Sequence, residues 1–381
     1  MLWETSAAVA GGQKMTLTVM DLLKEDYEFH CLIPGEGVLS EELKKRGIPY
    51  TLMGDQTMPA GVKGKHVYFQ YAWLSLKNIV GSIWQICRVK PDILYAPGPA
   101  ALPWSAICGF LTGKPVIWHL HHMFADGPTK KLLDLTSRFQ SVKKIIAVSE
   151  VVADQITNPK GRQKAQCIYN PVDVERYAKG DRNKIRAEME AELGRKPGRE
   201  NDFVLLETAV LRKTKYQDLF VRVIDALKRK GVSVTGILVG EAISEDDQIF
   251  KQDLIRQIQD GNLTEDIYMA GYRKNVNDYL AAADLVFVPS DVEGLSLAAQ
   301  EAMSAQRDVV ATEAGGVGEL LRVADCGNLY PQDADADEIA DLILAARTAD
   351  RHKQLQNGYR FCLDHNREAY RESVQQAFGK V

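Results

Sequence analysis

The feature that most constrains the fold of this chain is a regular alternation of short apolar runs with amphipathic stretches from end to end. Many of the apolar runs are β-branched and bounded by Gly, Pro or charged residues, a pattern that predicts buried β-strands. The expected strands are 28–33, 93–95, 116–120, 144–148, 167–169, 203–208, 235–239, 267–269, 285–289 and 309–311.

The stretches between these runs predict helices, because their apolar residues recur at helical spacing. The clearest are 13–23, 40–46, 218–229, 275–282, 295–305 and 337–346. Strand and helix in turn favour right-handed βαβ units, with helices on both faces of parallel sheets. The expected fold class is therefore α/β.

A charged stretch in the middle of the chain predicts the domain boundary. Residues 174–201 carry Lys, Arg and Glu in excess and end in a loop with two glycines and a proline, which is typical of a solvated connection. We expect an N-terminal Rossmann-like domain over 1–175, a linker over 176–202 and a second Rossmann-like domain over 203–350. Residues 351–381 are expected to form a polar surface helix. This helix could also cross back and pack on the first domain. Ligands bind such sheets at the carboxyl ends of the strands, so the two sheets would face each other across a cleft.

Composition excludes several classes of protein. The chain has 381 residues, of which 45% are apolar and 26% charged, as in ordinary globular proteins. Its net charge of −4 argues against a nucleic-acid partner, because such binders need Lys and Arg in excess. The six cysteines form no C-x-x-C pair, and no apolar run is long enough to span a membrane. Because no secretory leader is visible at the start, we expect a cytoplasmic protein.

The first 175 residues are more basic than the rest, with 19 Lys and Arg against 16 Asp and Glu. Within them, Trp73, Lys77, Trp84, Arg88 and Lys90 form a basic and aromatic stretch. One interpretation is peripheral contact of the N-terminal domain with the anionic inner face of a membrane. The other is a helix whose tryptophans face the core. The sequence leaves both open.

Two glutamates, Glu293 and Glu301, lie eight positions apart where a strand passes into a helix. Their separation along a helix is up to about 12 Å, roughly the length of a sugar-diphosphate-ribose unit. One carboxylate could accept from hydroxyl groups at each end of such a ligand. Spacing alone is equally compatible with two surface glutamates.

The setting of these glutamates resembles that of the retaining glycosyltransferases of family 4, which have a GT-B fold of two Rossmann-like domains and an E-x(7)-E signature. Several pieces carry the resemblance in order and spacing: Gly11-Gly12, 147–150, 168–173, Lys215, 281–290, the paired glutamates, 309–312, and Gly315-Gly316 with Glu319. The resemblance implies a retaining, metal-independent transferase without a cofactor.

The resemblance also implies roles for individual residues. Lys215 would neutralise charge on the departing phosphate, Glu301 would accept from the ribose hydroxyls, and Glu293 would contact the transferred sugar. Further donor contacts are expected from Gly294, Leu295 and Ser296. His121 matches the family histidine on the acceptor side, and with Lys215 and Glu293 it completes the expected catalytic set.

Glycines before two predicted helices add a separate argument from the residues themselves. Gly12 precedes the helix over 13–23, and Gly315 and Gly316 precede a helix from Val317. Glycine at such a place lets backbone N–H groups and the positive end of the helix approach an anion closely. A tight turn is the plainer interpretation of each. By resemblance, these glycines flank the donor diphosphate.

One expected donor ligand departs from the family pattern. Aligning on Lys215 puts Val210 where the family has an arginine. We therefore expect Arg212 to bind the diphosphate in place of that arginine. On an extended loop Arg212 lies on the same side as Val210, and Lys213 points the other way.

Two possible metal motifs are weighed and set aside. His119, His121 and His122 could hold a metal ion, but no nearby carboxylate or cysteine completes the set. The D-x-D run Asp333–Asp337 comes late in the chain, and we interpret it as acidic caps of the helix over 337–346. No metal site is expected.

The expected function is transfer of a hexose from a nucleotide diphosphate sugar to a cell-envelope polysaccharide or a lipid-linked saccharide. UDP is favoured over GDP on the family's base rate alone. The alternatives are a nucleotide-sugar 2-epimerase or a hydrolase of the same fold, an NAD-linked oxidoreductase and a non-catalytic partner protein. The oxidoreductase is disfavoured because no G-x-G-x-x-G follows a strand.

Overall fold

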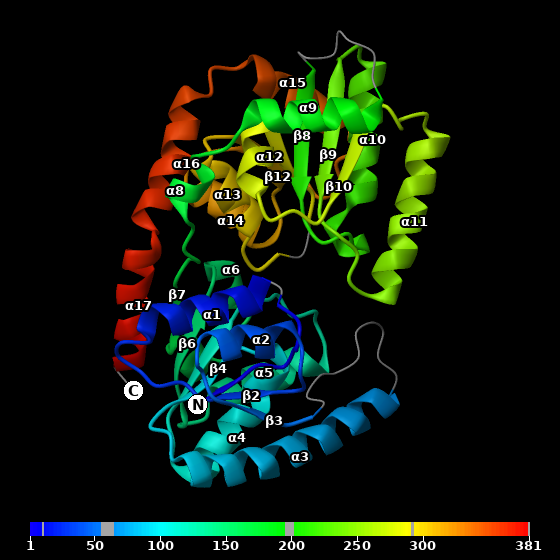
Figure 1. Ribbon diagram of the computed structural model, residues 1–381. Coiled ribbons are helices and arrows are strands. Elements are labelled where there is room, and N and C mark those ends of the chain that lie inside the picture. Colours follow the sequence, from blue (N-terminus) through cyan, green and yellow to red (C-terminus); the bar gives the residue numbers. More distant parts are fainter. Residues whose placement is uncertain (10, 55–64, 195–201, 291–292, 380–381) are drawn as a thin grey trace. The chain divides into compact units, whose positions relative to one another are not determined.

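The computed structural model describes residues 1–9, 11–54, 65–194, 202–290 and 293–379 (Figure 1). The chain forms two compact units. Unit 1 comprises Met1–Asn170 and Arg367–Val381, and unit 2 comprises Pro171–Asn366. Each is an α/β sandwich with a parallel sheet, so the expected fold class of two Rossmann-like domains is confirmed.

The sheet of unit 1 has, among the described residues, seven strands in the order β3-β2-β1-β4-β5-β6-β7. All of its pairs are parallel. The strands are β1 (Leu2–Trp3), β2 (Cys31–Ile33), β3 (Tyr50–Leu52), β4 (Leu94–Ala96), β5 (Val116–Leu120), β6 (Val142–Ala147) and β7 (Ala165–Cys167).

Helices cover the sheet of unit 1, and one of them comes from the far end of the chain. Tyr370, Val374 and Phe378 of α17 are buried in the same core as Leu2, and Figure 1 shows α17 in red beside α1 in blue. The helices are α1 (Gly11–Leu23), α2 (Val38–Lys45), α3 (Lys65–Val89), η1 (Pro99–Ala101), α4 (Leu102–Thr112), α5 (Pro128–Ser137), α6 (Glu150–Asp154), α7 (Pro159–Arg162) and α17 (Arg367–Gly379).

The sheet of unit 2 has, within the described part of the chain, six parallel strands in the order β10-β9-β8-β11-β12-β13. Its centre is β8, whose residues are buried on both faces, as a doubly covered parallel strand requires. The strands are β8 (Phe203–Thr208), β9 (Val234–Val239), β10 (Ile267–Gly271), β11 (Leu285–Val288), β12 (Asp308–Thr312) and β13 (Asn328–Tyr330).

The strongest amphipathic helix of unit 2 is α10, which buries Phe220, Val223 and Ile224 against the sheet. The helices of this unit are α8 (Val174–Tyr177), α9 (Arg182–Leu193), η2 (Lys213–Lys215), α10 (Gln217–Arg229), α11 (Glu245–Asp260), α12 (Val276–Ala282), α13 (Leu297–Ser304), α14 (Gly315–Val323), α15 (Ala336–Thr348) and α16 (His352–Asp364).

The division of the chain differs from the one expected from the sequence. The stretch expected as a linker, 176–202, contains helix α9, which packs on α12 within unit 2. Few apolar residues hold it, mainly Ile185 and Met189, while Arg182 and Arg186 pair with Asp284. A helix that is held by ion pairs has a charged sequence with few apolar residues. Such a sequence resembles a solvent-exposed linker, which explains why a linker was expected here. The expected surface helix over 351–381 is two helices, α16 in unit 2 and α17 in unit 1.

The order of strands locates a switch point in each sheet. In unit 2 the chain runs outward from β8 to β10 on one side and from β11 to β13 on the other. In unit 1 the corresponding neighbours are β1 and β4. Loops diverge at the carboxyl ends of these strand pairs, and ligands of open α/β sheets bind there. No helix among the described residues is both long enough and apolar enough to cross a membrane.

Candidate active site

The switch point of unit 2 brings together two of the residues expected to act on the donor. Lys215 ends η2, the turn after β8, and Glu293 follows β11. The Lys215 ammonium donates a hydrogen bond to Glu293 Oε1, and both side chains are only partly exposed. A cation and a carboxylate therefore meet at the carboxyl ends of adjacent strands, where a charged ligand would bind.

The loop that carries Glu293 is held against the start of α14 by glycine. A Cβ at Gly316 would lie 1.9 Å from the carbonyl oxygen of Gly294 and 3.1 Å from the Cα of Leu295, so only glycine fits. The Gly316 N–H donates to the Glu293 carbonyl at 2.8 Å. That N–H is therefore engaged in the loop. Gly315, at a φ of 60°, makes the left-handed turn that begins the helix.

Glu301 lies inside α13, as the sequence predicts, and its neighbour comes from α8. The Tyr177 hydroxyl donates to Glu301 Oε1 at 2.6 Å. Burial, followed by the Glu301 charge, raises the pKa of Tyr177. Ser296 caps this helix by accepting from the Ala299 N–H at 3.3 Å. Ser296 is thus the N-cap of α13. The carboxylate of Glu301 is oriented by the Tyr177 hydroxyl.

Arg212 pairs with an acidic residue of α11. Its Nε and Nη2 donate to the two carboxylate oxygens of Asp247, each at 2.9 Å. Asp247 is buried in the first turn of α11 and also accepts from the Ser244 N–H. The expectation that Arg212 replaces the family arginine rests on the direction of an extended loop. In this structure a buried acid on α11 engages the guanidinium fork, and the role of Arg212 toward a diphosphate stays a prediction.

Sequence reasoning missed Glu207, near the end of β8. The residue is 3% exposed, and the Gln217 side chain lies beside its carboxyl group. Burial raises its pKa well above the usual range, and the nearby Lys215 opposes this shift. A buried carboxyl group with a raised pKa therefore lies close to the Lys215–Glu293 pair. The signal in the sequence is a lone acid within an apolar strand.

In unit 1, His121 lies just beyond the end of β5 and is almost fully buried. Its ring centroid is 4.0 Å from that of His119, whose Nδ1 is 2.6 Å from the Tyr95 hydroxyl. Burial, and then the proximity of His119 and His122, lowers the pKa of His121 well below its usual value. His121 is thus a neutral ring at neutral pH, and its Nε2 has no hydrogen-bond partner in the described structure.

Gly12 faces these histidines from the first turn of α1. A Cβ at Gly12 would be 3.6 Å from His122 Nε2 and 3.9 Å from His121 Cδ2, an ordinary contact. Beneath it, the buried carboxylate of Glu4 accepts from Gln13 and Thr16 of the same helix. The edge of unit 1 therefore joins a helix start, a buried acid and neutral imidazole rings.

One of the two possible metal motifs has a structural role. Nowhere in the described parts of the chain does a group of three His, Cys, Asp or Glu side chains converge as metal ligands would. Asp335 accepts from the N–H groups of Asp337 and Glu338 at 2.9 Å each and so caps α15. The interpretation of the D-x-D run as a helix cap is confirmed.

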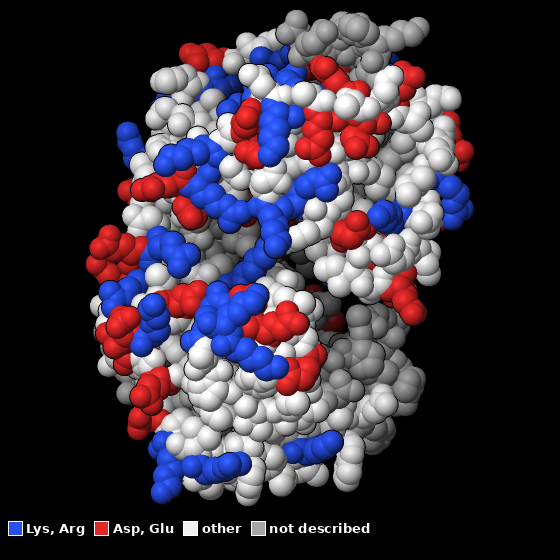
Figure 2. All heavy atoms as spheres, viewed as in Figure 1, with Lys and Arg blue, Asp and Glu red and all other residues white. Residues whose placement is uncertain are grey.

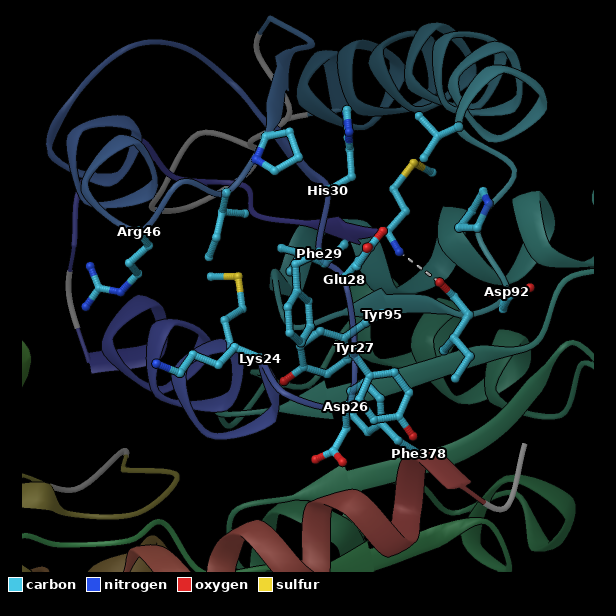
Figure 3. A pocket seen from close by; sticks show the side chains of 18 of the residues that line it. Lys24, Asp26, Tyr27, Glu28, Phe29, His30, Arg46, Asp92, Tyr95 and Phe378 are labelled. Atoms are coloured by element: carbon cyan, nitrogen blue, oxygen red, sulfur yellow. Dashed lines mark hydrogen bonds between the residues drawn. The ribbon is translucent and has the colours of Figure 1, made fainter.

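A separate hollow of about 960 Å³ opens in unit 1 (Figure 3). It is lined by residues that precede β2 and β4, including Glu28, His30 and Asp92. At its wall the Met1 amino group donates to the Ile93 carbonyl at 2.9 Å. It therefore lies at the amino ends of the strands, the opposite edge from the glycines and histidines described above, so we assign no donor or acceptor to it.

Comparison with known proteins identifies the family. Residues 11–176 match the model of the family described as Glycosyltransferase Family 4, and residues 189–360 match that of Glycosyl transferases group 1. The chain is a family 4-like glycosyltransferase of the GT-B fold. The family expected from the ordered motifs is confirmed.

Individual relatives are distant. The chain is 26% identical to D-inositol 3-phosphate glycosyltransferase 1 of Catenulispora acidiphila over 276 residues, which are 67% of this chain and 63% of that protein. It is 28% identical to the amylovoran biosynthesis glycosyltransferase AmsK of Erwinia amylovora over 148 residues, 37% of this chain and 35% of the relative. The chain thus spans less than two thirds of the length of either curated relative.

Solved structures share the fold over the whole chain. The Anabaena protein Alr3699/HepE in complex with UDP superposes with a TM-score of 0.80 at 22% identity, covering 100% of this chain and 99% of HepE. The same protein in complex with UDP-glucose gives a TM-score of 0.78 at 21% identity. At this identity the likeness shows the GT-B fold.

Proposed function

We propose that this glycosyltransferase moves a hexosyl unit from a UDP-sugar to a saccharide acceptor. The observation that carries the proposal is the contact of Lys215 with Glu293 at the switch point of unit 2. An ammonium at this edge can neutralise a diphosphate, and a carboxylate beside it can accept from sugar hydroxyls. Fixed charges of this kind are usually the largest catalytic contribution to such reactions.

The donor site that we propose uses unit 2 in two further ways. Glu301, oriented by Tyr177, would accept from the ribose hydroxyls. Gly294, Leu295 and Gly316 would shape the floor beside the diphosphate, because their backbones already touch. Arg212 is left out of this proposed set, since Asp247 occupies it.

In the proposed reaction, the bond between C1 of the sugar and the phosphate oxygen breaks, and a bond from C1 to an acceptor oxygen forms. The acceptor proton passes to the leaving phosphate, and the configuration at C1 is retained without a metal ion. His121 of unit 1 would bind the acceptor or the sugar as a neutral ring, because burial lowers its pKa. UDP is proposed over GDP because HepE, which shares the fold, was solved with UDP and UDP-glucose.

The acceptor that we propose is a cell-envelope polysaccharide or a lipid-linked saccharide. AmsK takes part in amylovoran biosynthesis by its name, which supports a polysaccharide. The D-inositol 3-phosphate enzyme is a relative with a small acceptor. The 2-epimerase and the NAD-linked oxidoreductase are not favoured by the family matches.

A thermal-shift panel of UDP, GDP, ADP, UDP-glucose and NAD tests the proposal. A ligand at about a hundred times its Kd adds about 2.7 kcal/mol to the free energy of unfolding, so UDP and UDP-glucose should raise Tm clearly. The Lys215→Ala variant, if it binds about tenfold more weakly, should lose about half of this stabilisation or more. A response to NAD without a response to UDP-sugars would overturn the proposal.

A further inference from the structure

Helix α3 of unit 1 presents an apolar face to solvent. Trp73, Leu76, Val80 and Trp84 are 69%, 54%, 63% and 59% exposed. They are spaced three or four positions apart, so they form one stripe along the helix, about 16 Å long from Trp73 to Trp84. The alternative that these tryptophans face the core is wrong. We call these four residues the α3 stripe.

The inner face of the same helix is mixed, with buried polar residues beside the buried Ile86. Asn78, Ser82 and Gln85 are buried at 2%, 0% and 5% exposure. Ser82 Oγ accepts from the Trp3 indole N–H at 3.0 Å. The helix therefore attaches to unit 1 through both polar and apolar groups, while the four residues of the α3 stripe remain exposed. Contiguous exposed apolar surface of this kind marks an interaction site.

The charges on the outer face of α3 are all positive. Lys77 and Arg88 lie on the same side as the α3 stripe by helical spacing, and the helix contains no Asp or Glu. The Arg88 guanidinium lies over the Trp84 ring, 5.5 Å from its centroid. Figure 2 shows blue and white spheres without red ones along the lower edge of the view, where α3 runs.

We propose that the α3 stripe lays unit 1 on an anionic lipid bilayer, with α3 in the plane of the interface. Tryptophans and aliphatic residues flanked by Lys and Arg are what such interfacial helices present to headgroups and acyl chains. A second copy of the chain suits the stripe less well. A twofold interface pairs a surface with itself, so it would bring the positive charges of two α3 helices together without any acid of α3 between them. The proposal stands apart from the donor site in unit 2.

Sedimentation with vesicles tests this proposal on the full chain. The protein should bind vesicles of phosphatidylcholine mixed with phosphatidylglycerol, and should bind phosphatidylcholine alone far more weakly. Trp73→Ala with Trp84→Ala should weaken binding by about tenfold or more. The exposed pair Ile249→Ala with Val323→Ala in unit 2 is the matched control and should leave binding unchanged. Equal losses in the two double variants would overturn the proposal.

Intrinsic fluorescence gives an independent measurement. Of the five tryptophans, Trp3, Trp104 and Trp118 are buried, so a blue shift on adding vesicles reports the two in the α3 stripe. The shift should occur with anionic vesicles and disappear in high salt. Its absence with anionic vesicles at low salt would contradict the proposal.

Charge variants separate docking through α3 from general attraction to basic protein. Lys77→Gln with Arg88→Gln should lower affinity for anionic vesicles about tenfold or more. Lys131→Gln with Lys143→Gln removes two charges from other elements of unit 1 and should change it much less. Similar losses in both would overturn the assignment to α3. A dimer in solution that Trp73→Ala with Trp84→Ala converts to a monomer would instead assign the stripe to self-association.

Discussion

Lys215 and Glu293 are hydrogen-bonded although 78 positions separate them in the chain. The pair joins the loop after β8 to the loop after β11, the two strands where the connections of the sheet diverge. Without donor, each charge has the other as its partner. A diphosphate that binds Lys215 must therefore compete with Glu293.

The first prediction is that substitutions of Lys215 and Glu293 affect the binding of UDP and of UDP-glucose differently. Lys215→Ala should weaken UDP binding about tenfold or more, because a charge-assisted hydrogen bond is lost. Glu293→Gln should keep or improve UDP binding, since a competing carboxylate is removed, and should weaken UDP-glucose relative to UDP. Calorimetric titration of both ligands measures this. Unchanged UDP affinity in Lys215→Ala would remove the lysine from the site.

The second prediction concerns the ribose. Glu301→Ala should weaken UDP binding about tenfold or more, and Tyr177→Phe, which removes only the orienting phenol, should weaken it less. The wild type should prefer UDP to 2′-deoxy-UDP, and Glu301→Ala should lose that preference. Glu192→Ala, at an exposed position on α9, is the control and should behave as the wild type. If Glu301→Ala still prefers UDP to 2′-deoxy-UDP, the proposed contact of Glu301 with the ribose is wrong.

The third prediction follows from the raised pKa of Glu207. The unfolded chain has a carboxyl pKa of about 4.3, so the stabilisation from keeping Glu207 neutral is fully present below that pH and is lost as pH rises toward the folded pKa. Glu207→Gln should therefore become more stable than the wild type as pH rises. The gap should grow by about 1.4 kcal/mol per pH unit over that window.

Urea unfolding from pH 5 to pH 8 measures this difference. Glu192→Gln, at an exposed position, provides the control, and its stability should follow that of the wild type at every pH. A constant offset between Glu207→Gln and the wild type would show that Glu207 is ionised in the folded protein.

The fourth prediction decides what Arg212 does. Arg212→Ala leaves the buried Asp247 carboxylate without its bidentate partner and should cost about 1–3 kcal/mol of stability. Its effect should not add to that of Asp247→Ala, because the two residues contact each other. UDP affinity should be unchanged. A loss of about a hundredfold in kcat without a loss of stability would restore Arg212 as a ligand of the transferring phosphate.

The fifth prediction tests the glycine contact behind Glu293. Gly316→Ala would place a Cβ 1.9 Å from the Gly294 carbonyl oxygen, where backbone must move. We expect a loss of about 1–3 kcal/mol in the free energy of unfolding together with weaker UDP-glucose binding. Gly35→Ala, where a Cβ meets nothing within 4 Å, should do neither. Normal donor affinity in Gly316→Ala would show that this contact does not shape the site.

Local patterns determined much of the architecture. Two of the expected strands, 116–120 and 203–208, have the observed bounds, because a β-branched run bounded by polar residues reports the backbone directly. Glu301 is inside a helix and Asp335 caps one, as the spacing predicts. The motifs also identified the family, since they record a site whose parts come in a set order along the chain.

Tertiary structure decided which side chains meet and which faces are covered. The partner of Arg212 is a buried acid on α11, and Glu207 is buried because β8 is the central strand of unit 2. Helical spacing identifies the stripe of α3 but not the direction in which it points, and only the packing of the opposite face, which buries Ser82 and Ile86, shows that the stripe is exposed. Hydrophobic periodicity and secondary-structure propensity are properties of neighbouring residues. The partner of a side chain and its burial depend on residues that lie tens of positions away. The sequence by itself therefore determined the elements and the family, and only the packing of those elements determined the partners of its charges.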